Sequence, residues 1–172
     1  MKLGVDKWCI VWYYVYRKRE EIKTMTRKVY FDMDGTIANL YAVEGWLESL
    51  RAEHTKPYRE AKPMVNMRAL GRELNRLQKA GYIIGVITWL SKDGTEEYNA
   101  RTTETKKKWL EKHLGAVNFD EFHALEYGTP KEFYGEGILF DDEEYNRKEW
   151  AKYENNLAFG VENILEILEK MC

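Results

Sequence analysis

Cysteine, histidine and proline are scarce in this chain. Its 172 residues include two cysteines, three histidines and three prolines. Cys9 and Cys172 lie near opposite ends, and the histidines at 54, 113 and 123 are scattered. Neither set has the close spacing of a zinc site, and two distant cysteines do not make a disulfide scaffold. We expect an intracellular, reduced environment and a cytoplasmic location.

A long apolar run and a surplus of charge are also missing. The run at residues 8–16 has nine residues, whereas a helix needs about 20 to cross a bilayer. The formal net charge is −2, which argues against a broad basic surface for nucleic acid. We therefore expect no membrane partner and no stable nucleic-acid partner. With 44% hydrophobic and 33% charged residues, the composition is that of an ordinary globular domain.

The chain divides into an N-terminal extension and a core. Residues 1–26 hold the apolar run and then a charged stretch, and Met25 offers a natural start just before the first core strand. We predict that residues 1–26 form an extension outside the core. Residues 27–172 then form one domain, with an insert at about 37–65.

Short apolar runs alternate with amphipathic segments along this core. Such an alternation predicts a Rossmann-like α/β fold, with a doubly wound parallel sheet in three α/β/α layers. Gly81 is expected to end one helix, and a turn at 129–132 is expected to be capped by Thr129, with Pro130 first. The predicted strands are 29–32, 82–88, 122–125, 137–141 and 157–159; the predicted helices are 66–80, 102–114, 143–152 and 161–171.

The insert at 37–65 interrupts the alternation. It contains a predicted helix around 42–53 and two prolines, Pro57 and Pro63. Because it leaves from the carboxyl end of the first strand, it should lie over the ligand-binding edge of the sheet. We expect a small helical cap.

Acids, a hydroxyl and an ammonium stand where the predicted strands end. Asp32 and Asp34 follow the first strand, Thr88 ends the second, and Lys131 precedes the pair at 141–142. The carboxyl ends of parallel strands line one crevice, so these distant segments can meet. That collection suits Mg²⁺ and a phosphoryl group.

This order resembles the four motifs of the haloacid dehalogenase superfamily over residues 27–171. The resemblance implies that Asp32 is a nucleophile forming an aspartyl-phosphate, and that Asp34 is the general acid and base. It implies that Thr88 binds a phosphoryl oxygen and Lys131 stabilises charge. Mg²⁺ would be held by Asp32, Asp34, Asp141 and Asp142, one of the last two directly. An aspartate at position 34 resembles the phosphatases and mutases of the superfamily.

Other interpretations of these residues are open. The segment at 32–36 could be a plain turn or part of a calcium loop, although the residues that follow are too apolar for calcium. Thr88 could simply end a strand. Lys92 and the lysines at 106–108 compete with Lys131, and Asp141 and Asp142 could serve to start a helix.

Residues 106–142 more closely resemble the 5′(3′)-deoxyribonucleotidase branch. That likeness implies an Mg²⁺-dependent phosphomonoesterase acting on nucleoside monophosphates. Tyr41, Trp46 and Trp89 are then predicted substrate-binding residues, with Tyr58 a further candidate, although such aromatic residues also pack caps onto cores. The alternatives are a polynucleotide 3′-phosphatase, a small-metabolite phosphatase, or a non-catalytic phospho-ligand-binding protein of the same fold.

Overall fold

Five parallel strands form the centre of the molecule. The computed structural model describes residues 27–171, so the predicted extension at 1–26 lies outside the described residues. The sheet order is β5-β4-β1-β6-β7, with every neighbouring pair parallel. This confirms the predicted Rossmann-like sheet. The strands are β1 (Lys28–Phe31), β4 (Ile83–Trp89), β5 (Glu121–Leu125), β6 (Ile138–Phe140) and β7 (Leu157–Phe159).

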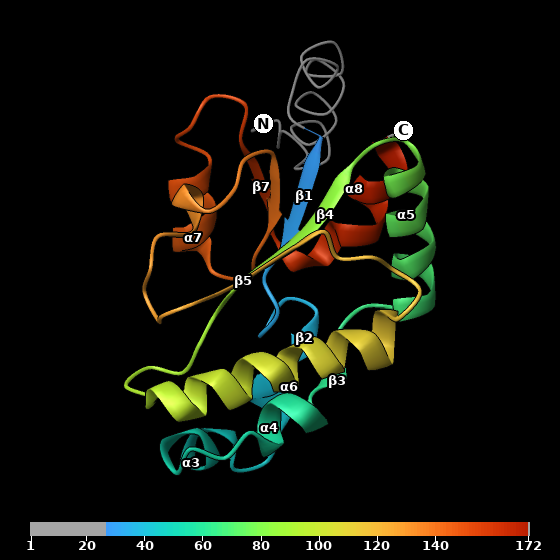
Figure 1. Cartoon of the computed structure of the whole chain (residues 1–172). Coiled ribbons are helices and arrows are strands. Elements are labelled where there is room, and N and C mark those ends of the chain that lie inside the picture. Colours follow the sequence, from blue (N-terminus) through green and yellow to red (C-terminus); the bar gives the residue numbers. More distant parts are fainter. Residues whose placement is uncertain (1–26, 172) are drawn as a thin grey trace, which may run out of the picture.

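Helices cover both faces of this sheet (Figure 1). Because side chains alternate along a strand, Val29 and Phe31 join one core cluster and Tyr30 joins another. The first cluster contains residues of α5 (Met67–Lys79), α6 (Glu96–Leu114) and α8 (Ile164–Lys170). The second contains Trp150 of α7 (Glu144–Trp150), so the three-layer arrangement is confirmed. No helix among the described residues is long and apolar enough to cross a bilayer.

Local signals set the ends of the two long helices. The Asn66 side chain accepts a hydrogen bond from the Ala69 N–H at 3.1 Å and starts α5, and Gly81 follows its end with a φ of +86°. Helix α6 begins six residues before the predicted start at 102, where the Thr95 hydroxyl caps the Tyr98 N–H. The first turns of α6 were missed because they are largely polar, and Tyr98 is their one buried apolar side chain.

The connection between β5 and β6 differs from the predicted alternation. It contains no α-helix, only the 3₁₀ turn η2 (Lys131–Phe133). The predicted Thr129 cap is wrong: Pro130 holds the cap position and there is no side-chain cap. The Thr129 carbonyl instead accepts a hydrogen bond from the Trp89 indole N–H at 2.8 Å. The predicted last helix is also divided, into η3 (Val161–Asn163) and α8.

The insert after β1 is a small helical cap, as predicted. It holds two short helices where one was predicted, and a two-stranded antiparallel ribbon closes its base. The cap lies beside α6 beyond the end of the sheet (Figure 1), where Leu40, Tyr58 and Tyr98 form a separate apolar cluster. Its elements are β2 (Ala38–Asn39), η1 (Leu40–Ala42), α3 (Trp46–Arg51), α4 (Lys56–Glu60) and β3 (Lys62–Pro63).

Candidate active site

Three adjacent strands bring the predicted acids and hydroxyl to one edge of the sheet. Asp32 follows β1, Asp141 follows β6, and Thr88 lies near the end of β4. The Asp32 N–H donates to the Phe140 carbonyl at 2.8 Å, so the parallel pairing of β1 and β6 reaches the acids themselves. The β5–β6 connection adds Lys131 from the 3₁₀ turn. The four predicted segments therefore meet in one place.

The turn after Asp32 depends on a glycine. Gly35 has a φ of +83°, and a β-carbon there would overlap the Asp142 carboxylate and lie 2.7 Å from the Tyr41 ring. The buried Thr36 hydroxyl donates to Asp142 Oδ1 at 3.2 Å and accepts from the Asp142 N–H at 3.0 Å. The first and last predicted motifs are thus joined directly.

Lys131 is a buried cation between two carboxylates. Its Nζ lies 2.8 Å from Asp32 Oδ1 and 2.7 Å from Asp141 Oδ2. Burial acts to lower the pKa of the Lys131 ammonium, but the two carboxylates outweigh it and raise the pKa above its ordinary value. Of the competing lysines, Lys92 lines the nearby cavity and Lys107 is exposed. Lys131 is therefore the lysine that contacts the predicted nucleophile.

The two consecutive aspartates have different environments. Asp141 has no exposed surface, and its oxygens accept bonds from Lys131, from the Asn146 amide and from the Glu143 N–H. Asp142 lines the cavity. Burial first, and then the charge of Asp32, raise the pKa of Asp141 to about 6 and that of Asp142 to about 7. Asp142 is thus the acid of the pair that is open to a ligand.

A second lysine, Lys106, is also buried at this site. The sequence predicted no separate role for it, only that it was one of the lysines competing with Lys131. Its Nζ lies 2.6 Å from Asp34 Oδ2 and 2.8 Å from Thr88 Oγ1. Burial raises the pKa of Asp34, and the Lys106 ammonium opposes that rise. A signal was present, because Lys106 precedes Trp109 and Leu110 by three and four residues. It therefore shares the buried face of α6 with them.

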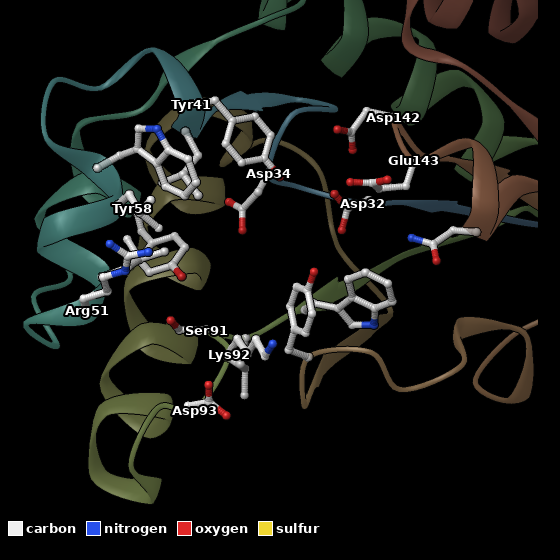
Figure 2. Close-up of a pocket in the computed structure, with 18 of the residues that line it drawn as sticks. Asp32, Asp34, Tyr41, Arg51, Tyr58, Ser91, Lys92, Asp93, Asp142 and Glu143 are labelled. Carbon is white, nitrogen blue, oxygen red and sulfur yellow. The ribbon is translucent and has the colours of Figure 1, made fainter.

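The cavity at this edge has a volume of about 490 Å³ and lies between the core and the cap. Figure 2 shows Asp32, Asp34 and Asp142 in its wall, with Tyr41 close by. Tyr41 is 48% exposed, and its ring meets that of Trp46 edge-on at 5.1 Å. Trp89 also lines the cavity.

Two of the predicted site residues, Tyr58 and Thr88, expose little or no surface. Tyr58 is 4% exposed, and its ring lies 5.0 Å from Lys106 Nζ. Thr88 is fully buried and does not line the cavity, and its hydroxyl accepts a hydrogen bond from Lys106 Nζ at 2.8 Å. The substrate-binding and phosphoryl-binding roles of the named residues stay predictions.

The carboxylates that line the cavity are suitable Mg²⁺ ligands, although they do not surround an ion completely. No three His, Cys, Asp or Glu side chains within residues 27–171 are arranged to hold a metal ion. Mg²⁺ is commonly held by only one or two carboxylates, with water and substrate phosphate completing its shell. Asp32 and Asp142 offer such carboxylates, and the raised pKa of Asp142 indicates a place where a cation is favourable. Asp141 is already occupied by hydrogen bonds.

Comparisons with known proteins give little beyond this geometry. No family model matches the chain, and no curated protein matches it. Among solved structures, it is similar to a D,D-heptose 1,7-bisphosphate phosphatase from Burkholderia thailandensis, with 15% identity. The likeness covers 77% of this chain and 91% of that one, with a TM-score of 0.42. A likeness of this size identifies neither a family nor an activity, so any assignment rests on the side chains.

Proposed function

We propose that the chain is an Mg²⁺-dependent phosphomonoesterase that removes phosphate from nucleoside monophosphates. The observation that carries the proposal is the set of three carboxylates, Asp32, Asp34 and Asp142, in the wall of one cavity with Lys131. Three carboxylates against two lysines leave an excess of negative charge that repels a phosphate, so a protein that only bound phosphate would gain nothing from them. Carboxylates are useful there as a nucleophile, a proton donor and metal ligands.

The reaction would proceed in two steps, formation and then hydrolysis of an aspartyl-phosphate. An Asp32 oxygen attacks phosphorus, the bond to the leaving oxygen breaks, and Asp34 gives its proton to that oxygen. Water then attacks the aspartyl-phosphate and gives its proton to Asp34, which releases phosphate and restores Asp32. The raised pKa of Asp34 suits the protonated form that the first step needs. Lys131 would stabilise negative charge beside Asp32.

Mg²⁺ would be held by Asp32 and Asp142, and by Asp34 as the resemblance implies. Its charge would reduce the repulsion between the carboxylates and the phosphate. Asp141 would hold Lys131 in place from below the site rather than bind the ion, because its oxygens already accept hydrogen bonds.

Aromatic side chains and the cap favour a small nucleotide. Tyr41 and Trp46 come from the cap, and Trp89 lies against Tyr127, whose ring is 5.1 Å away. A base can stack on such rings, and each stack is worth about 1–3 kcal/mol. The cap stands over the cavity, so a polynucleotide should be a poor substrate. We expect deoxynucleotides to be preferred over ribonucleotides.

The test is a phosphate-release screen with and without Mg²⁺. The panel holds deoxynucleoside and ribonucleoside monophosphates, sugar phosphates, an aryl phosphate and an oligonucleotide 3′-phosphate. Asp32→Asn should abolish release and leave the protein folded, because Asp141 still pairs with Lys131. Release within tenfold of the parent would refute the covalent mechanism. If sugar phosphates or oligonucleotide ends rank above every nucleoside monophosphate, the nucleotide assignment fails and the phosphatase assignment stands.

A further inference from the structure

Lys106 is buried beneath the cavity and uses all three of its protons. Only 1% of its surface is exposed, and it reaches the site from the middle of α6. Its Nζ donates to Asp34 Oδ2 at 2.6 Å, to Thr88 Oγ1 at 2.8 Å and to the Trp89 carbonyl at 2.8 Å. An ammonium has three donors, so this one is fully committed.

These three acceptors belong to two different strand ends. Asp34 lies beyond β1, whereas Thr88 and Trp89 are the last residues of β4. Lys106 therefore fixes the acid of one strand end relative to the hydroxyl of the next. Without it, the Asp34 carboxylate would have no side-chain hydrogen-bond donor among the described residues, and its rotamer would be set by packing alone.

The cap also packs on this lysine. The Tyr58 ring, in α4, lies 5.0 Å from Lys106 Nζ, a distance at which a cation and an aromatic ring attract each other. One helical turn further along α6, the Trp109 indole N–H donates to the Ala61 carbonyl at 2.7 Å, just after α4 ends. The same face of α6 thus contacts the cap and the predicted acid.

We propose that Lys106 is a positioning residue: it holds Asp34 in the orientation that donates a proton to the leaving group, and it couples that orientation to cap helix α4 through Tyr58. This inference rests on the proposed phosphatase function. Lys106 does not line the cavity, whereas Asp34 and Lys131 do. It therefore acts through Asp34 rather than on the substrate.

A dependence on the leaving group distinguishes this role from a general structural one. A nucleoside leaves as a strongly basic alkoxide and needs a proton, whereas 4-nitrophenolate leaves readily without one. The value of kcat/KM reports on the step in which the leaving group departs, because that step precedes hydrolysis of the aspartyl-phosphate. Loss of a positioned acid should therefore affect the two substrates unequally.

The test compares Lys106→Met with Lys112→Met, an exposed lysine of the same helix, in the full chain with Mg²⁺. For Lys106→Met we expect kcat/KM to fall about 100-fold with a nucleoside monophosphate, as for loss of a general acid. With 4-nitrophenyl phosphate it should fall less than about threefold. Lys112→Met should match the parent on both substrates. Equal losses on both substrates with Lys106→Met would overturn the inference and leave the phosphatase function standing.

A second variant keeps the test decisive if Lys106→Met does not fold. In Asp34→Asn the acid is already lost, so adding Lys106→Met should lower kcat/KM for the nucleotide less than about threefold, and the neutral pair avoids an unpaired buried charge. A further loss of tenfold or more in this background would show that Lys106 acts independently of Asp34. A parent without Mg²⁺-dependent phosphate release would refute the proposed function, and the inference with it.

Discussion

Asp142→Asn should stabilise the metal-free protein at alkaline pH while removing its response to Mg²⁺. Burial and the charge of Asp32 raise the pKa of Asp142 from its ordinary value of 3.8 to about 7. The folded state therefore binds this proton more tightly than the unfolded state. The cost of folding with a charged Asp142 is absent below about pH 4, grows as the pH rises, and is complete above about pH 7.

The size of the effect follows from the rise in pKa. Taken in full, the rise corresponds to roughly 4 kcal/mol, at about 1.4 kcal/mol per unit. The Asp142 carboxylate borders an open cavity, so solvent screening reduces the expected gain to about 1–2 kcal/mol. For a domain of this length, that is a melting temperature higher by about 3–6 °C. The asparagine keeps an oxygen for the Thr36 hydroxyl, so the bond to that residue need not be lost.

The assay is thermal unfolding followed by circular dichroism, at pH 8 and pH 4, with EDTA or with excess Mg²⁺. In EDTA the variant should exceed the parent at pH 8 and nearly match it at pH 4. Mg²⁺ should raise the melting temperature of the parent and barely change that of the variant. The control is Glu143→Gln, an exposed neighbour in the same cavity wall, which should behave like the parent. A variant no more stable than the parent at pH 8, or still stabilised by Mg²⁺, would refute the reasoning.

Three further outcomes are expected. Lys131→Met should lower the free energy of unfolding in urea by about 3–5 kcal/mol, because it leaves Asp32 and Asp141 as unpaired buried charges; an unchanged urea midpoint would contradict the buried pairing. Leu74→Ala, in the face of α5 that packs on the core, should cost about 3 kcal/mol in the same assay and keep the kcat of the parent; loss of activity in the folded variant would argue against a purely structural role. Tyr41→Ala should lower kcat/KM for a nucleotide about tenfold, as loss of ~1.4 kcal/mol implies, and hardly change that for an aryl phosphate; equal effects on both would exclude base stacking.

The parallel sheet could be predicted because its signals are local. Short apolar runs such as residues 83–88 mark strands buried on both faces, and an acid placed after such a run marks the ligand edge. Chain order and parallel pairing then suffice to bring Asp32 and Asp141 together. Because Phe31 pairs with Phe140 in this parallel register, the residues that follow them, Asp32 and Asp141, lie at the same level of the sheet.

The cap and the connection to β6 could not be predicted in the same way. Helices α3 and α4 have six and five residues, too few to form without packing, so their sequence carries little helical signal. The ribbon of β2 and β3 has two residues on each strand. The role of Lys106 was hard to predict for another reason, because it is one of three consecutive lysines. Only its position on the buried face of α6 distinguishes it from the exposed Lys107 and Lys108.

The β2–β3 ribbon makes the cap an exchangeable unit. It pairs Ala38 with Pro63 and Asn39 with Lys62, so the chain leaves the core and returns to it at the same point. The entropy of closing a loop grows only slowly with its length, so segments of different size can be grafted between residues 39 and 62 at little cost to the sheet. Under the proposed function, substrate range could then change with the part of the insert that lies away from α6, while Tyr58 and Ala61 keep their contacts with that helix.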